Sequence, residues 1–167
     1  TGMIRPVESW TRISVASLSI GYEVSATSIQ MLQAINIVAN KGMAVSPYIA
    51  KKIMNLPEYI VRRQPKQKRV ISEKTALLLT SMLEKVVEEG TGVPARINGY
   101  RVAGKTGTAQ KFDPLTKSYS SRLHTSSFFG FVPSDNPVIS MIVVLDEPKV
   151  GYYGGEVSAP VFKEVAS

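Results

Sequence analysis

The chain has 167 residues, of which 44% are apolar, and 20 Lys and Arg against 13 Asp and Glu give a formal net charge of +7. This size and composition predict one globular domain, and the longest apolar run, from Ile139 to Leu145, is far shorter than the roughly 20 residues that cross a bilayer. The absence of cysteine excludes disulfides and thiolate metal sites, and no signal peptide is visible at the start.

The first half of the chain predicts two helices. Thr27 and Gln30 form a capping-box pattern that opens an amphipathic helix, and Gly42 supplies its C-terminal turn. Ser72 is expected to cap a second helix that stops at Gly90, with an apolar face at Leu78, Leu79, Met82, Leu83, Val86 and Val87. Between the helices, residues 44–54 predict a short extended piece interrupted by a proline.

The positive charge gathers in the run RRQPKQKR, from Arg62 to Arg69. Such a run can bind nucleic acid, but no aromatic residue is interleaved with these charges to stack on bases. The Gln-Pro-Lys-Gln in its middle is typical of a solvated loop. We therefore expect an exposed loop and no nucleic-acid partner.

The second half predicts three strands, at Tyr100–Lys111, Ser126–Val132 and Val138–Asp146, because β-branched and aromatic residues dominate it. The turn residues 133–137 join the last two strands into a hairpin. After Gly154-Gly155 the ending SAPVFKEVAS predicts a helix with its proline in the first turn. The expected fold class is α+β, an antiparallel sheet of three strands flanked by helices.

The stretch from Gly99 to Thr106, G-YRVA-G-K-T, fits the phosphate-binding pattern G-x-x-x-x-G-K-[ST], and the later MIVVLDEP resembles its magnesium-holding partner motif. That loop must follow a buried strand and open a helix, whose N-terminus holds the phosphates. A proline and a turn signal precede this stretch, and Gly107, Thr108 and Pro114 oppose a helix after it. A nucleotide hydrolase is thus the less favoured interpretation.

The same letters contain Lys105-Thr106-Gly107, one of the short motifs of penicillin-binding proteins and serine β-lactamases. On an exposed strand edge, the Lys105 ammonium can hold a substrate carboxylate, and the Thr106 hydroxyl gives a further contact. Gly107 has no Cβ, so a ligand backbone can approach closely, and the backbone N–H of Thr108 can face a developing oxyanion.

Four longer stretches extend this likeness along the chain, namely GYEVSATSIQMLQAINIVANKG, EEGTGVPARINGYRVAGKTGTAQK, SSFFGFVPSDNPVISMIVVLDEP and GYYGGEVSAPVF. In this order they resemble the C-terminal part of the class B penicillin-binding proteins. The DEP followed by GYYGG and APVF is similar to the division-specific transpeptidases of that class.

The resemblance implies a serine D,D-transpeptidase with no cofactor, anchored in the cytoplasmic membrane with its catalytic domain outside. It implies that peptidoglycan stem peptides are the substrate, that β-lactams acylate the full-length enzyme, and that division-complex proteins are partners. By the same resemblance, Tyr152 and Tyr153 lie beside the substrate cleft and contribute an aromatic wall.

Two motifs of that family are not found. No serine lies three residues before a lysine, so residues 1–167 contain no Ser-x-x-Lys nucleophile. Ser134-Asp135-Asn136 spells Ser-x-Asn, but it follows Lys105 in the chain and is predicted to be a hairpin turn. We therefore expect residues 1–167 to be the last part of one transpeptidase domain, inactive alone and able to self-associate. A non-catalytic module that binds wall peptide or a protein partner is the alternative.

Three further residues carry side chains that are common in active sites. His124, the single histidine, is expected at the start of a strand in a structural or exposed role, because no metal or triad partner is indicated. Asp146 and Glu147 could form a carboxylate pair for acid–base work. They are expected to point to opposite faces of a strand end and to be structural. No metal site is expected.

Overall fold

The structure is a computed structural model that describes residues 2–49, 52–55, 59–62, 65–115 and 117–167. Within these residues the helices are η1 (Val7–Ser9), α1 (Ser14–Ser19), α2 (Ser28–Ala39), α3 (Glu73–Glu88), η2 (Val93–Ala95), α4 (Gly154–Val157) and α5 (Ala159–Ala166). The strands are β1 (Met3–Ile4), β2 (Val24–Ser25), β3 (Met43–Val45), β4 (Lys52–Asn55), β5 (Tyr59–Arg62), β6 (Gln67–Arg69), β7 (Ala103–Asp113), β8 (Ser118–Val132) and β9 (Ile139–Asp146). No helix in these ranges is long and apolar enough to cross a membrane.

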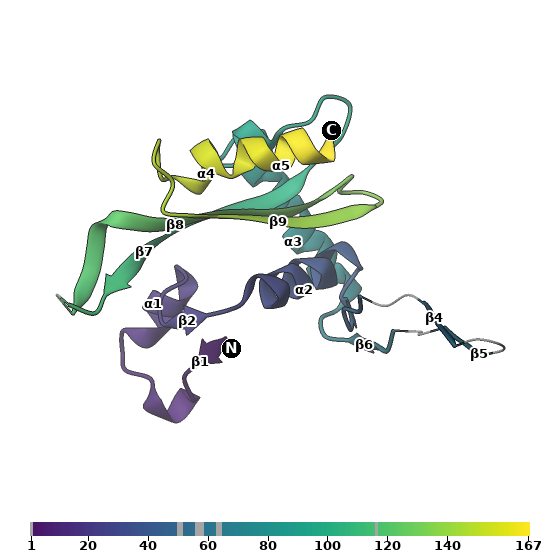
Figure 1. Cartoon of the computed structure of the whole chain (residues 1–167), viewed down its shortest axis with the longest axis horizontal. Helices are drawn as coiled ribbons and strands as arrows, with labels where there is room; N and C mark the ends of the chain where they lie inside the picture. The colour runs from purple at the N-terminus through teal and green to yellow at the C-terminus, as the bar shows by residue number, and fades with distance from the viewer. Residues whose placement is uncertain (1, 50–51, 56–58, 63–64, 116) are drawn as a thin grey trace.

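The central element is an antiparallel sheet with the strand order β7-β8-β9. Helices α4 and α5 lie over one face of this sheet, α2 lies under the other, and α3 runs close to β7 (Figure 1). The predicted α+β class and the three-stranded antiparallel sheet are therefore confirmed.

The alternation of side chains along β8 explains why helices cover both faces of the sheet. Phe128 and Val132 are buried on the face that packs against Phe162 of α5, and the rings of Phe128 and Phe162 meet edge-on with centroids 4.9 Å apart. Phe131 points to the opposite face, where it packs with Ile35 of α2. The sheet is consequently held in place from both sides.

Helix caps begin α2 and α3 at the predicted residues. The Thr27 side chain accepts a hydrogen bond from the backbone N–H of Gln30 at 3.3 Å, and the Gln30 side chain accepts one from the backbone N–H of Thr27 at 2.9 Å. Ser72 accepts from the backbone N–H of Thr75 at 3.0 Å. Gly42, with φ of +88°, follows α2 as predicted.

The strand boundaries differ from those predicted. Strand β8 begins at Ser118 rather than Ser126, because this polar stretch pairs with the outer part of β7 across an irregularity between Gln110 and Phe112. His124 therefore lies within β8 rather than at its start. Strand β7 begins at Ala103 rather than Tyr100.

The prediction of a plain loop for the basic run is wrong in part. Gln67–Arg69 forms β6, which pairs antiparallel with β3 although its residues are exposed, and Arg62 ends β5. Residues 63 and 64 of the run lie outside the described residues, as do residues 50 and 51 of the predicted extended piece. Strand β6 forms because its backbone pairs with β3, and the polar residues of the run give no signal that predicts this pairing.

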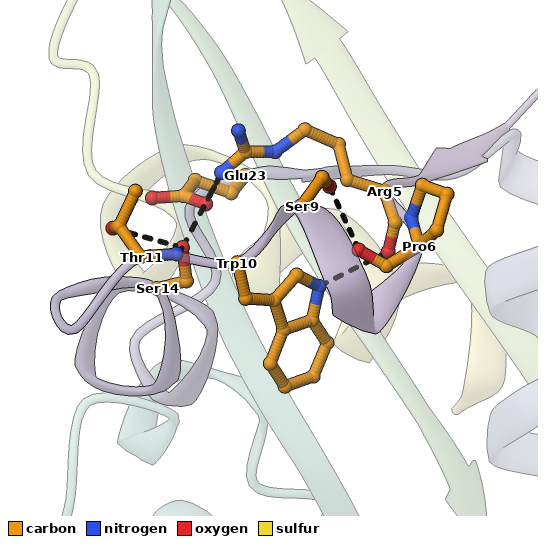
Figure 2. Close-up of polar contacts among 7 residues, drawn as sticks. All are labelled: Arg5, Pro6, Ser9, Trp10, Thr11, Ser14 and Glu23. Carbon is orange, nitrogen blue, oxygen red and sulfur yellow. Dashed lines mark hydrogen bonds and ion pairs between the residues drawn. The ribbon is translucent and has the colours of Figure 1, made fainter.

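A polar network organises the N-terminal segment, residues 2–25 (Figure 2). Arg5 is paired with Glu23 and also donates to the Oγ of Ser14 at 3.4 Å, and Trp10 Nε1 donates to the carbonyl of Arg5 at 3.0 Å. The hydrogen bond from Arg5 lowers the pKa of Glu23. Edge-on contact between the rings of Tyr22 and Tyr119, with centroids 6.4 Å apart, joins this segment to β8.

Candidate active site

A groove of about 530 Å³ borders β7. Four separate parts of the chain line it, namely Ile20 from the N-terminal segment, Thr91 and Pro94 after α3, Lys105, Thr106, Gly107 and Thr108 of β7, and Tyr153, Gly154, Gly155 and Glu156 at the start of α4. Strand β7 is at the edge of the three-stranded sheet. The groove thus contains the four residues that the sequence assigned to an exposed strand edge and, of the two loop tyrosines, Tyr153 but not Tyr152.

Lys105 lies inside β7, opposite Phe129 of β8, and its side chain is exposed. Its ammonium donates to the carbonyl oxygen of Thr106 at 2.9 Å and to the Oγ1 of Thr106 at 3.3 Å. The phosphate-loop alternative is wrong, because it requires this lysine at a helix N-terminus. A cation on an open strand edge is instead suited to hold a negatively charged group of an extended ligand.

The two threonines of β7 are tied to different neighbours. The Thr106 Oγ1 lies 2.7 Å from the Oγ1 of Thr91, and the backbone N–H of Gly154 donates to the Oγ1 of Thr108 at 3.0 Å. Side chains alternate along a strand, so both hydroxyls belong to the face that α4 covers. The segments before β7 and after β9 therefore orient the polar groups of the groove.

Gly154 marks the place where three backbone segments meet. A Cβ on Gly154 would lie 2.3 Å from the carbonyl oxygen of Ser127 and 2.5 Å from that of Gly107. Real Cβ atoms do not approach backbone oxygen so closely, and only glycine lets the start of α4 lie against the strands here. A Cβ on Gly107 would instead lie 2.5 Å from the Oγ of Ser127.

The two tyrosines have different positions. Tyr153 lines the groove, whereas Tyr152 is packed between the rings of Tyr153 and His124, with both centroid distances 4.4 Å. The Tyr152 hydroxyl donates to that of Tyr153 at 3.2 Å, which raises the pKa of Tyr152 above its ordinary value of 10.0. Ser126 donates its hydroxyl hydrogen to the carbonyl of Tyr152. Tyr152 thus supports the wall that Tyr153 presents.

His124 is buried, with 7% of its surface exposed, and its Nδ1 has no hydrogen-bond partner within the described part of the chain. Its ring stacks on Tyr152 at an interplanar angle of 18°. In the described ranges no three His, Asp or Glu residues are gathered so that they could hold a metal ion. The position of His124 is that of a packing residue behind the loop of Tyr152.

The expectation that Asp146 and Glu147 point to opposite faces is wrong. Both accept from the ammonium of Lys111, at 3.0 Å to Asp146 Oδ2 and 2.7 Å to Glu147 Oε1. Glu147 has a φ of +50°, so the strand alternation on which the expectation relied ends before it. The pair therefore fastens the ends of β7 and β9.

Ser134-Asp135-Asn136 lies in the connection between β8 and β9, as predicted for a hairpin turn. The backbone N–H of Ser134 donates to the carbonyl of Arg101 at 2.9 Å, and its hydroxyl donates to Glu84. Arg101 in turn contacts Glu84 and Asp135 at 3.4 and 3.5 Å. This Ser-x-Asn therefore anchors the turn to α3.

Sequence reasoning missed the groove residues Ile20, Thr91, Pro94, Gly154, Gly155 and Glu156. Thr91 stands between two glycines after α3, a position typical of a turn, and its proximity to Thr106 arises only when α3 packs beside β7. Ile20 follows a short helix in a segment that gave no strong pattern. For Gly154 a signal was present, because two adjacent glycines often mark a close backbone approach.

A search against family models matches residues 1–167 to the transpeptidase domain of penicillin-binding proteins. The chain is 40% identical over 165 residues to stage V sporulation protein D of Bacillus subtilis, which covers 96% of this chain and 25% of that protein. It is 36% identical over 178 residues to penicillin-binding protein PbpB of Mycolicibacterium smegmatis, covering 100% of this chain and 27% of that protein.

Solved structures give the same result. The crystal structure of penicillin-binding protein 3 from Mycobacterium tuberculosis, complexed with aztreonam, superposes with a TM-score of 0.91 at 33% identity and covers 99% of this chain and 39% of that one. The transpeptidase domain of penicillin-binding protein 3 from Burkholderia pseudomallei gives 0.84 at 37% identity, covering 99% and 48%. The chain therefore spans about a quarter of the curated relatives named above and less than half of these crystallised chains.

Proposed function

The chain belongs to the penicillin-binding protein transpeptidase family, and on this premise we propose that residues 1–167 form the C-terminal part of one peptidoglycan D,D-transpeptidase domain. The observation that carries the proposal is the groove beside β7, where Lys105 to Thr108 face an open strand edge. An extended stem peptide adds to this edge as a further strand.

Catalysis proceeds through a serine acyl-enzyme. The serine oxygen attacks a peptide carbonyl, the C–N bond breaks, and the leaving amine takes up a proton; the amine of a second stem peptide then attacks the ester and releases the serine. With a β-lactam the first step opens the ring and leaves the serine acylated. Lys105 supplies positive charge, Thr106 and Thr108 donate to the ligand carboxylate, Gly107 leaves room for the ligand backbone, and the Thr108 N–H stabilises the oxyanion.

The acylating serine belongs to a part of the protein outside these 167 residues, because they contain no Ser-x-x-Lys. A lysine or other base beside the serine is needed to activate its hydroxyl. The chain alone therefore contributes one wall of the site and does not turn over substrate.

We infer the cellular role from the relatives together with three stretches of the sequence. The DEP, GYYGG and APVF stretches support the division-specific type, and the relatives include a sporulation protein and one crystallised protein that was solved with aztreonam and with ampicillin. We place the protein in the cell envelope, anchored on the outer face of the cytoplasmic membrane, among the partners of the division complex. β-Lactams are its inhibitors.

The test is the acylation rate of the full-length protein by a fluorescent penicillin, with Lys105→Ala compared with Lys163→Ala. Lys105 is exposed in the groove, whereas Lys163 is exposed on α5, outside the groove lining. Loss of a charge-assisted contact typically costs about 1.5 to 3 kcal/mol, so Lys105→Ala should slow acylation roughly ten- to hundredfold. Lys163→Ala should react as the unaltered protein does. Equal rates for both variants would show that Lys105 is incidental to acylation, whereas no acylation of the unaltered protein would favour the non-catalytic module.

A further inference from the structure

Thr91 is one of the polar residues of the groove to which the proposed function gives no role. It lies between α3 and η2, and its hydroxyl contacts that of Thr106 at 2.7 Å. Its carbonyl oxygen is covered by the start of α4, since a Cβ on Gly155 would lie 2.3 Å from it. Thr91 is therefore held between β7 and α4.

The Thr106 hydroxyl has one hydrogen bond of fixed direction, from Lys105, and one, with Thr91, that can run either way. A hydroxyl has one hydrogen to donate and two lone pairs that accept, whereas an ammonium only donates. Lys105 therefore uses one lone pair of Thr106 Oγ1. If Thr91 donates to the second lone pair, the Thr106 hydrogen is left for a ligand; if Thr106 donates to Thr91, Thr106 has only a lone pair to offer.

Thr108 has the corresponding arrangement with less ambiguity. Its Oγ1 accepts from the backbone N–H of Gly154, which cannot act as an acceptor. The hydrogen of the Thr108 hydroxyl is therefore free of this contact. Thr106 and Thr108, on the same face of β7, thus each have a hydroxyl that is hydrogen-bonded to a neighbouring segment.

We propose that Thr91 is a positioning residue for anion recognition, which donates to Thr106 so that the hydroxyls of Thr106 and Thr108 both donate into the groove. A carboxylate accepts from both hydroxyls and favours this direction of the Thr91–Thr106 bond, and the bond in turn polarises the Thr106 hydroxyl. A neutral ligand does not select the direction. The inference rests on the proposed function, and it makes Thr91 a residue that contributes to the preference of the groove for acidic ligands.

The experiment compares acylation of the full-length protein by ampicillin and by ampicillin methyl ester, which lacks the carboxylate charge. The variant Thr91→Val removes the hydroxyl at nearly constant shape, and Thr91→Ser keeps it. We expect Thr91→Val to lower the rate constant for the acid about three- to tenfold and that for the ester by less than twofold, since a single hydrogen bond has this effect. Thr91→Ser should restore the preference for the acid.

A double-mutant cycle with Thr106→Val gives a second measurement. Once Thr106 has no hydroxyl, Thr91→Val should cause no further loss with the acid. A role of Thr91 in packing alone predicts equal losses with acid and ester, or additive losses in the cycle, and either result overturns the proposal. Thermal unfolding of each variant shows whether the fold is retained, and Thr91→Ala replaces Thr91→Val if it is not.

The outcome also separates this inference from the proposed function. If the unaltered protein is not acylated by either compound, the proposed function is refuted. If the unaltered protein is acylated and prefers the acid, but Thr91→Val keeps the full preference, only the role of Thr91 is refuted.

Discussion

Lys111 lies on the same strand as the lysine of the groove but performs a different task. Its ammonium bridges Asp146 and Glu147, and Thr125 donates to Asp146 at 3.1 Å. The hydrogen bonds to Glu147 and then to Asp146 raise the pKa of Lys111, and the bond from Lys111 is the main cause that lowers the pKa of Asp146. The four side chains join three strands at one end of the sheet.

These shifts predict how stability depends on pH. A lowered carboxyl pKa stabilises the fold above the unfolded value of 3.8 for Asp146, and this contribution is lost as the pH falls through the folded-state pKa. A raised lysine pKa stabilises the fold below the unfolded value of 10.5 for Lys111, and this contribution is lost as the pH rises through the folded-state pKa.

We therefore expect Lys111→Met to lower the urea midpoint of the chain slightly at neutral pH, because exposed ion pairs contribute little. The difference from the unaltered chain should shrink below pH 3.8 and above pH 10.5. Urea titrations over this range measure it, with Lys163→Met on α5 as the control. A difference that stays constant across the range would show that packing of the lysine stem, rather than its charge, stabilises the sheet.

At the scale of elements, α3 has a hydrogen-bonded N-cap but an apolar face that is only partly buried. Ser72 caps it, Val87 is buried, and Leu83 packs against the core, but Leu78 and Met82 of its predicted apolar face remain 56% and 53% exposed. The helix carries Thr91 at its C-terminal side, so its placement beside β7 determines one wall of the groove.

Removal of the cap should weaken this element in a measurable way. Ser72→Ala should lower the free energy of unfolding of the chain by about 1 kcal/mol, because the backbone N–H of Thr75 loses its acceptor. Ser72→Asp should retain most of the stability. Ser81→Ala is the matched control, as its hydroxyl bonds the carbonyl of Leu78 within the helix, where alanine is favourable. Equal losses for Ser72→Ala and Ser81→Ala in urea unfolding would contradict the assigned cap.

Local chemistry explains which elements the sequence predicts. The caps of α2 and α3 involve residues three apart, so the pattern of Thr27 with Gln30 is sufficient to find one of them. The start of β8 at Ser118 and strand β6 depend on pairing with distant strands, and polar stretches give no periodic signal for it. The same limit applies to the groove. Lys105 is predicted from its motif, whereas Thr91 enters only through the packing of α3.

At the scale of the whole molecule, the described groove has walls from both ends of the chain and from its middle. Ile20, Thr91, Thr106 and Tyr153 meet there although they are far apart in sequence. In the proposed function the groove supplies an oxyanion donor and a cation and takes its nucleophile from elsewhere. The 167 residues should therefore supply groups that bind a ligand in the groove but should not be acylated by it.

We therefore expect the isolated 167-residue chain to form no covalent adduct with a β-lactam. Serines without an adjacent base react only as weak alcohols. The purified chain and the full-length protein are incubated with a fluorescent penicillin and compared by denaturing gel and intact mass. Only the full-length protein should carry a stoichiometric label that survives boiling. Such a label on the isolated chain would reveal a nucleophile within these residues.

The contact between Phe128 and Phe162 has a consequence for biosynthesis. Phe128 pairs with Thr106 across the sheet, and its ring is covered by α5, one of the last parts of this chain to be made. The amide that contacts Thr108 also comes late, at Gly154. A ribosome delivers the polypeptide from its N-terminus, so the groove stays unfinished while most of the chain has already been translated. A nascent or truncated polypeptide that ends before α4 therefore exposes strand β7, with Lys105, without the later segments that orient its side chains.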